Sequence, residues 1–353
     1  MDVERKVDMV MRRPAEEVLT REDLKQMFET EAHPRHYIGF EISGKVHLGT
    51  GLSTALKIRD FMEAGIKPTI FLADYHAWIN GKMGGDLEKI QRVANGYFKS
   101  AFLSLGLEEG KVDYVLASEL YDNDYWKSVL EVSKSTTLAR MLRCTTIMGR
   151  KEGDATDSAS VLYPAMQVAD IFKLDVSLAH SGMDQRKVHV LAREVAEKLK
   201  KRKPAAVHVK LLMGLQGPKR MGMDSDEKAD MEISSKMSKS DPDSCIYIHD
   251  SEEDIKRKLK KAYCPEKQVS ENPLIDMCEI LLLRDDGTTL KIERPEKFGG
   301  DLELNLRELK STYSEGKLHP VDLKNAVGKE LSRILEPSRK YFEQHKELLG
   351  QVG

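Results

Sequence analysis

Two short segments, far apart in the chain, carry residues that could bind a polyphosphate. The first reads Lys236-Met237-Ser238-Lys239-Ser240. Its two ammonium groups lie three residues apart, so both could reach one triphosphate, and the hydroxyl and backbone N–H groups between them could complete a cradle for its oxygens. Taken alone, such a run is more often an ordinary solvated loop.

The second segment, residues 44–50 (GKVHLGT), follows a predicted strand and opens a predicted helix. Gly49 would let the backbone approach a nucleotide closely, and a helix amino terminus favours an anion. His47 could donate a hydrogen bond to an α-phosphate as charge builds there. A lone histidine is more often part of a packed core, but its combination with Lys236 and Lys239 favours phosphate binding.

Together, in this order and about one nucleotide-binding fold apart, the two segments resemble the paired signatures of class I aminoacyl-tRNA synthetases. The usual His-Ile-Gly-His signature stands here as His47-Leu48-Gly49-Thr50. Thr50 can donate a hydrogen bond but cannot carry charge, which leaves open how much it stabilises the transition state. The resemblance implies that the catalytic residues are His47, Thr50, Lys236 and Lys239, and that ATP is bound by His47, Gly49, Lys236, Ser238, Lys239 and Ser240.

A polar stripe on a predicted helix is the third feature. Pro164 suits the first turn of a helix, and Tyr163, Gln167 and Asp170 then share one face, because they are four and three residues apart. A phenol, an amide and a carboxylate in an otherwise apolar helix must find hydrogen-bond partners. A pocket for a small polar ligand is favoured over a purely structural network.

At this point the resemblance narrows. Residues 37–41 (YIGFE), 163–170 and 182–187 (GMDQRK) look like a tyrosyl-tRNA synthetase of the archaeal/eukaryotic type, with similarity from about Tyr37 to Pro337. The resemblance implies that Tyr37 and Asp170 hydrogen-bond the phenolic hydroxyl of the substrate. It implies further tyrosine-binding residues: Gly39, Glu41 and His76 at the pocket, and Tyr163, Gln167 and Gln185 at the α-ammonium group. For His76, a satisfied core position stays an equal alternative.

The same resemblance implies a tRNA-binding surface in the last third of the chain. Phe298 and His319 would stack on an unpaired base, and Asp322 would accept hydrogen bonds from a guanine edge. Arg186 and Arg143 are weaker candidates for the acceptor end. Without the resemblance, these positions indicate only a turn and a helix start.

The elements that must position these residues alternate between strand and helix. Strands are expected at 37–41, 68–74, 112–118, 176–180 and 206–212, and helices at 48–64, 86–105 and 184–200. This alternation predicts an α/β fold with a doubly wound, parallel, Rossmann-like sheet, which binds ligands beyond the carboxyl ends of its strands.

The expected domain organisation follows from the same pattern. Residues 1–33 form short charged helices, residues 34–215 the catalytic domain, and residues 120–172 a helical insertion within it. Residues 216–250 form a flexible loop that carries the lysine segment, because the stretch from Gly214 to Ser235 is aperiodic and rich in glycine, aspartate and lysine. The stretch 217–234 is longer than the family suggests and could be an acidic flap or disordered. Residues 251–353 form a mainly helical domain with a β-like piece at 289–294.

The composition of the chain limits which kinds of protein it can be. The 353 residues include 56 Lys and Arg against 58 Asp and Glu, so a polyanion would have to be held by local patches. The four cysteines have no metal-type or Cys-x-x-Cys spacing, so no tightly bound protein metal and no disulfide framework is expected. The charged amino terminus and the absence of a long apolar window predict no membrane association and a cytoplasmic location.

The resulting expectation is an enzyme that activates L-tyrosine with ATP and Mg²⁺ and transfers it to tRNA(Tyr). The resemblance also implies a homodimer formed through the inserted helices. Two alternatives stay open: a tryptophanyl-tRNA synthetase, whose indole pocket has no evident use for Tyr37 and Asp170, and a non-catalytic RNA-binding paralogue, which Thr50 favours and the two lysines oppose.

Overall fold

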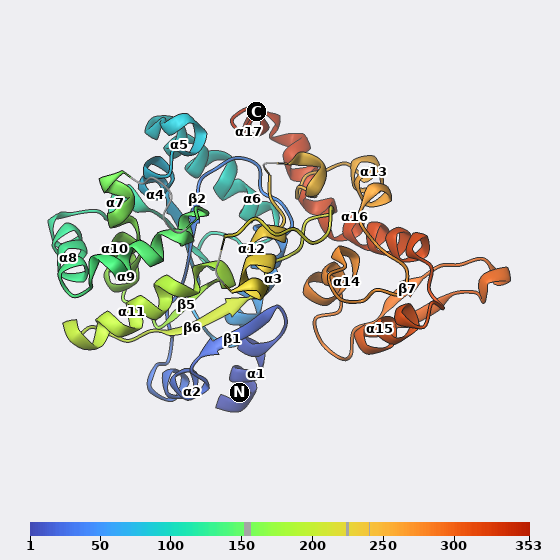
Figure 1. Cartoon of the computed structure of the whole chain (residues 1–353), viewed down its shortest axis with the longest axis horizontal. Coiled ribbons are helices and arrows are strands. Elements are labelled where there is room, and N and C mark those ends of the chain that lie inside the picture. Colours follow the sequence, from blue (N-terminus) through green and yellow to red (C-terminus); the bar gives the residue numbers. More distant parts are fainter. Residues whose placement is uncertain (152–156, 224–225, 240) are drawn as a thin grey trace.

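One twisted sheet organises the amino-terminal two thirds of the chain (Figure 1). The computed structural model describes residues 1–151, 157–223, 226–239 and 241–353. The strand order is β1-β6-β5-β2-β3-β4, and each neighbouring pair is parallel except β1 with β6. The strands are β1 Ala15–Leu19, β2 His36–Glu41, β3 Thr69–Ala73, β4 Asp113–Leu116, β5 Leu178–Gly182 and β6 Ala205–Val209. The predicted doubly wound α/β fold is confirmed.

The strands are apolar because both faces of the sheet are covered. Every residue of β3 is buried, as is typical of a parallel strand between two layers of helices. The covering helices are α1 Val3–Met11, α2 Arg21–Thr30, α3 Leu52–Glu63, α4 Asp74–Ile79, α5 Leu87–Val93, α6 Lys99–Ser104 and α11 Arg186–Leu199. Among the described residues, none of the helices has both the length and the apolar character that crossing a bilayer requires.

The inserted region between β4 and β5 is helical, as predicted. It contains α7 Ala117–Leu120, α8 Asn123–Lys134, α9 Leu138–Cys144 and α10 Ser158–Lys173. Because the chain runs from β2 to β3 and β4 on one side and from β5 to β6 on the other, the sheet changes winding direction between β2 and β5. The carboxyl ends of these two strands are therefore where a ligand is expected.

Three local predictions were wrong. The first 33 residues hold not only helices but also β1, which adds an antiparallel edge next to β6. Pro164 is not in a first turn, because α10 begins at Ser158 with Asp157 as its N-cap. The stretch predicted to lack regular structure contains helix α12, Glu227–Ser235, whose N-cap Asp226 accepts a hydrogen bond from the Ala229 N–H.

The last hundred residues pack beside the sheet, mostly on the right in Figure 1, with α17 at the top. They contain α13 Glu252–Lys261, α14 Pro273–Met277, β7 Leu290–Ile292, β8 Leu302–Leu304, α15 Leu306–Ser314, α16 Pro320–Gln344 and α17 Lys346–Leu349. The predicted β-like piece is one strand of the β7–β8 hairpin. The domain boundaries themselves stay a prediction.

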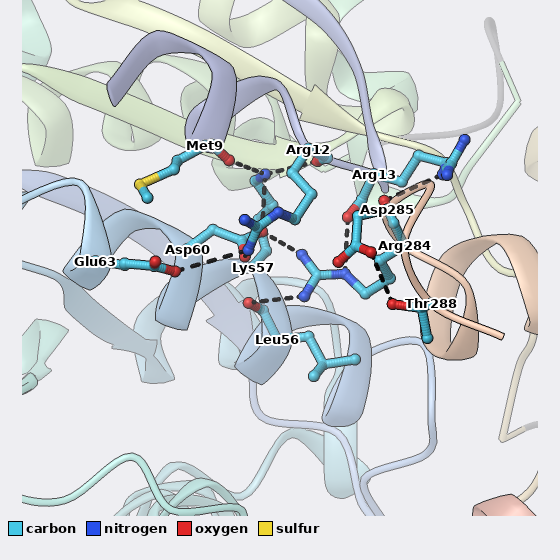
Figure 2. Close-up of polar contacts among 10 residues, drawn as sticks. All are labelled: Met9, Arg12, Arg13, Leu56, Lys57, Asp60, Glu63, Arg284, Asp285 and Thr288. Carbon is cyan, nitrogen blue, oxygen red and sulfur yellow. Dashed lines mark hydrogen bonds and ion pairs between the residues drawn. The ribbon is translucent and has the colours of Figure 1, made fainter. Parts of the chain in front are cut away.

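A buried ionic cluster joins α1, α3 and the segment after α14 (Figure 2). The Lys57 ammonium on α3 is fully buried and donates to the carbonyls of Met9 and Arg12, at 3.2 and 2.7 Å, and to the Asp60 carboxylate at 3.1 Å. The guanidinium of Arg284 also pairs with Asp60. Breaking such a pair leaves a buried charge without a partner, so the cluster fixes how the last third of the chain sits against α3.

Candidate active site

A cavity of about 420 Å³ opens at the carboxyl ends of β2 and β5. The predicted site residues that line it are Tyr37, Gly39, Glu41, His47, Gly49, Thr50, His76, Tyr163, Gln167, Asp170, Gln185, Lys236, Ser238 and Lys239. Segments more than 180 residues apart in the sequence thus meet in one place. Ser240 lies outside the described residues. The structure brings the predicted residues together, and the role of each stays a prediction.

Asp170, on α10, is buried at one end of this cavity. Its Oδ1 accepts a hydrogen bond from the Tyr121 hydroxyl at 3.0 Å, while its Oδ2 has no partner among the described residues. Burial raises the pKa of Asp170 well above its usual range. A hydrogen bond from a bound ligand would therefore relieve a poorly compensated group.

His76, on α4, presents a second unpartnered atom. Its Nδ1 lies 3.3 Å from the Tyr121 hydroxyl. Its Nε2 has no hydrogen-bond partner among the residues that the structure describes, and it lies 3.7 Å from Asp170 Oδ2. Burial lowers the pKa of His76 to about 3, so the ring is neutral. Because the Tyr121 proton is given to Asp170, His76 Nδ1 donates to Tyr121 and Nε2 is left as an acceptor. Two buried acceptors thus face the same space.

Tyr37 reaches the same end of the cavity from β2, and its position depends on Gly39. A Cβ atom on Gly39 would lie 2.5 Å from the Tyr37 hydroxyl oxygen, closer than any real contact. The ring of Tyr37 is buried and packs against Phe71 with centroids 5.5 Å apart. Because residue 39 has no side chain, the Tyr37 hydroxyl can occupy this position.

Glu41, at the end of β2, is the centre of a second polar group. Its Oε1 accepts hydrogen bonds from the Tyr163 hydroxyl and the Asn80 amide, both at 2.7 Å, and its Oε2 lies 3.4 Å from the Lys82 ammonium. Gln185 donates from Nε2 to the Ile147 carbonyl at 2.9 Å, which fixes its side chain at the rim. A partly buried carboxylate that accepts two neutral hydrogen bonds and already lies beside one ammonium group suits a cationic ligand.

His47 lies in the turn before α3. Its Nδ1 accepts from the backbone N–H groups of Gly49 and Thr50, at 3.2 and 3.4 Å, and its Nε2 lies 3.2 Å from the Thr50 hydroxyl. Burial and the nearby Lys239 lower the pKa of His47 to about 3. The ring is neutral and donates from Nε2 to Thr50, so the Thr50 proton is free to point elsewhere.

The lysine segment follows α12 and closes the other end of the cavity. Lys236 Nζ lies 2.7 Å from Asp184 Oδ2, and this carboxylate raises the pKa of Lys236. Lys239 Nζ donates to the Ser43 hydroxyl. Burial, and then the charge of Lys82, lower the pKa of Lys239 to about 8. The excess of positive charge at this end suits a strongly anionic ligand.

Comparison with known proteins identifies the family. The model for "tRNA synthetases class I (W and Y)" matches residues 29–336. The tyrosine–tRNA ligase of Thermococcus sibiricus is 52% identical over 99% of this chain and 97% of its own length, and that of Pyrobaculum calidifontis is 42% identical over 97% and 95%.

The solved structures agree. The tyrosyl-tRNA synthetase of Pyrococcus horikoshii, complexed with L-tyrosine, superposes with a TM-score of 0.94 at 50% identity, covering 100% of this chain and 99% of that one. The chain belongs to the tyrosyl-tRNA synthetases of class I. The predicted resemblance is confirmed. A tryptophanyl-tRNA synthetase from Aeropyrum pernix, with a TM-score of 0.74 at 20% identity, shares the fold.

The predicted RNA-contacting residues of this synthetase lie outside the cavity. Phe298, between β7 and β8, and His319, the N-cap of α16, are each about 60% exposed. Asp322 lies in the first turn of α16. Arg186 forms a two-point pair with Glu17, at 2.7 and 2.8 Å, so any RNA contact would compete with that carboxylate. Arg143 is exposed on α9.

Several residues of the synthetase site were missed by sequence reasoning. They are Ser43, Asn80, Lys82, Tyr121 and Asp184. Lys82 follows Gly81 in a turn in which Gly81, Met83, Gly84 and Gly85 all have positive φ, and that glycine cluster was the available signal. Asp184 lies inside a segment quoted for the resemblance. Tyr121 and Asn80 carry no sequence signal of their own.

Proposed function

We propose that the protein activates L-tyrosine with ATP and transfers it to tRNA(Tyr). The observation that carries this proposal is that the two ends of one cavity differ in chemistry. At one end, Asp170 Oδ2 and His76 Nε2 are buried and have no hydrogen-bond partner among the described residues. At the other end, Lys82, Lys236 and Lys239 gather positive charge. A phenol donor fits the first end and a triphosphate fits the second.

The phenol end favours tyrosine over its close analogues. The substrate hydroxyl would donate to Asp170 and accept from Tyr37, which satisfies groups that are otherwise costly to bury. Phenylalanine would leave both groups unpaired, a type of discrimination well described for tyrosyl-tRNA synthetases. Tryptophan would place an indole against Asp170 and Tyr37 without using the pair.

The α-ammonium group would occupy the polar cluster around Glu41. The Tyr163 phenolic oxygen and the amide oxygens of Gln167 and Gln185 would accept its three protons, and the Glu41 carboxylate would supply the opposite charge. Gly39 contributes through the space that it leaves for Tyr37. The carboxylate of the amino acid is then directed towards the lysine end.

Activation is a displacement at phosphorus. An oxygen of the tyrosine carboxylate attacks the α-phosphorus in line, the new O–P bond forms, and the bond to the β-phosphate breaks to release pyrophosphate. His47, being neutral, contributes no charge but orients the Thr50 hydroxyl, whose proton can be donated to an α-phosphate oxygen. Thr50 therefore does the work of a donor that the usual second histidine supplies.

The lysines stabilise the leaving pyrophosphate. Lys239 and Lys82 would contact the β- and γ-phosphates, and Lys236 would exchange its contact with Asp184 for one with the phosphates. Gly49, Ser238 and Ser240 belong to the same predicted ATP-binding set. No group of three acidic, histidine or cysteine side chains in the described part of the chain could hold a metal ion. The resemblance implies a Mg²⁺ that binds together with the ATP phosphates, where it would offset their charge.

Transfer to RNA completes the proposal. The terminal ribose hydroxyl of the tRNA attacks the carbonyl carbon of the adenylate and AMP leaves. Phe298 and His319 are exposed and Asp322 is partly exposed on the helical part of the chain, where residues 251–353 would read the anticodon. Arg143 and Arg186 stay weaker candidates for the acceptor end. Charging of tRNA also suggests a cytoplasmic location.

A homodimer through the inserted helices is part of the same proposal. Exposed apolar side chains lie on α10 and on the two helices that pack against it: Trp126 and Leu130 on α8, Leu138 and Leu142 on α9, and Leu162 on α10. Leu130 and Leu138 are each about 65% exposed. Such a patch is typical of an interface. Sedimentation of the wild type and of a Leu130→Glu, Leu138→Glu variant tests it, because the variant should be monomeric.

The decisive experiment is tyrosine-dependent exchange of labelled pyrophosphate into ATP. It requires no RNA and reports only the activation step. Exchange that depends on tyrosine and not on tryptophan supports the proposal. Exchange with tryptophan alone would assign the other specificity, and no exchange with either amino acid would leave an RNA-binding protein without activating chemistry.

A further inference from the structure

A buried tyrosine outside the cavity contacts the backbone of the turn that carries His47. The hydroxyl of Tyr97 accepts a hydrogen bond from the Val46 N–H at 2.8 Å, one residue before His47. Tyr97 is fully buried, and it does not line the cavity. A hydrogen bond of this kind fixes the position of the backbone from which His47 and Gly49 project.

A second contact orients this hydroxyl. Its oxygen lies 3.1 Å from Nε2 of His249. Since the oxygen already accepts from Val46, its proton is available for His249, whose pKa burial lowers to about 4. The strand-like segment around His249 also pairs with the turn, through Leu48 N to Ile246 O at 2.9 Å and Ile248 N to Val46 O at 3.1 Å.

The backbone of Tyr97 is itself unusual. Residues Ala94–Phe98 form a π-helical turn between α5 and α6, a feature often found at functional sites. The Tyr97 N–H donates to the side-chain oxygen of Gln351 at 3.0 Å. A Cβ on Gly96 would lie 2.3 Å from that oxygen, so Gly96 is the residue that admits Gln351.

Helix α16 completes the set. Phe342, near the end of α16, packs on the Tyr97 ring with centroids 5.4 Å apart and on the His249 ring at 5.3 Å. The ring of Tyr97 thus packs on side chains from the last third of the chain, whereas its hydroxyl contacts a turn in the first third.

We infer that Tyr97 is a positioning residue for tyrosine activation: it holds the turn that presents His47 and Thr50 to the α-phosphate, and Gln351 and Phe342 hold Tyr97. This inference rests on the proposed function. Tyr97 would touch neither substrate, so its removal should lower the rate of activation without weakening tyrosine binding.

The test is Tyr97→Phe, which removes one oxygen and keeps the packed ring. The kcat of pyrophosphate exchange should fall about tenfold, as expected for losing one buried hydrogen bond, with the KM for tyrosine unchanged. Tyr114→Phe is the matched control, because the Tyr114 hydroxyl also forms a hydrogen bond with the backbone, here as the donor to Leu107 O at 2.6 Å, on another part of the fold. Its kcat should match the wild type.

A second pair of variants separates positioning from stability. Gln351→Glu keeps an oxygen that can accept from the Tyr97 N–H and should retain the wild-type kcat, whereas Gln351→Leu should lose several-fold. If Tyr97→Phe lowers only the melting temperature, or lowers kcat no more than Tyr114→Phe does, the inference is overturned. Absence of exchange in the wild type would instead refute the proposed function.

Discussion

At one end of the cavity, Asp170 and His76 are buried, and both contact the hydroxyl of Tyr121. At the other end, Lys236 and Lys239 are partly exposed; Lys236 pairs with one carboxylate and Lys239 donates to one hydroxyl. The first arrangement is incomplete, since two buried atoms have no hydrogen-bond partner in the described part of the chain. The second arrangement is charged, and its lysines can exchange their present contacts for contacts with a ligand. We infer that the first end selects the substrate and the second supplies rate, so variants at the two ends should affect different kinetic constants.

The largest effect is expected from Lys239→Ala. Removing a charge that faces the leaving pyrophosphate should lower the kcat of pyrophosphate exchange by roughly 10²- to 10³-fold, while the affinity for tyrosine stays nearly intact. Exchange kinetics and tyrosine titration measure the two quantities. Lys228→Ala is the control, because Lys228 is on α12 and its side chain is 81% exposed. Equal losses of rate and tyrosine affinity would mean that the segment is structural.

Asp170→Ala should act on selectivity instead. The ratio of kcat/KM for tyrosine over phenylalanine, of order 10⁵ in enzymes of this kind, should fall by about 10²-fold because the buried acceptor is no longer left unpaired by phenylalanine. Exchange assays with each amino acid measure the ratio. Unchanged discrimination would remove Asp170 from the phenol pocket.

Gly39→Ala should disturb the same end by steric means. The added methyl would lie 2.5 Å from the Tyr37 hydroxyl, so the Tyr37 ring must move. We expect the KM for tyrosine to rise roughly 20-fold, within the cost of overpacking a filled site, and kcat to change little. Gly287→Ala, where the nearest atom would be 3.6 Å away, is the control.

The lysine end should show a pH dependence set by Lys239. Burial lowers the pKa of Lys239 to about 8, so its ammonium is present below that pH and lost as the pH rises through it. The kcat/KM for ATP should therefore fall about tenfold between pH 7 and pH 9. Lys239→Arg should remove this decline, since an arginine stays charged. A decline retained in the arginine variant would assign it to another group.

The smallest effect is expected from Asp322→Ala, at a third location. Loss of one partly exposed acceptor should raise the KM for tRNA about fivefold and leave pyrophosphate exchange unchanged. Aminoacylation kinetics measure the first constant. A parallel loss of exchange would contradict an anticodon role.

The sequence was informative where residue type and period both carried the signal. The buried apolar run of β3 and the alternation of strands with helices predicted the parallel sheet, and the pairing of His47 with Lys236 and Lys239 predicted a shared cavity. Both signals lie in the types and spacing of residues, which the sequence shows directly.

Other features depend on contacts that local pattern does not record. β1 is mixed in polarity and becomes a strand because β6 offers a free edge. Pro164 is tolerated inside α10, where the first-turn preference of proline gave the wrong start. Tyr121 and Asn80 enter the site only because α10 and β2 bring Asp170 and Glu41 beside them.

One helix, α16, runs from an exposed surface of this synthetase into its buried core. The 25 residues of α16 span about 37 Å, with His319 and Asp322 at the start and Phe342 near the finish. A tilt of about 3° at the first turn would carry the far end through about 2 Å, and Pro337 interrupts the hydrogen-bond ladder just before Phe342. The predicted anticodon-reading residues and the ring that packs on Tyr97 are thus joined by one helix, so a displacement at one end reaches the other unless the helix bends at Pro337.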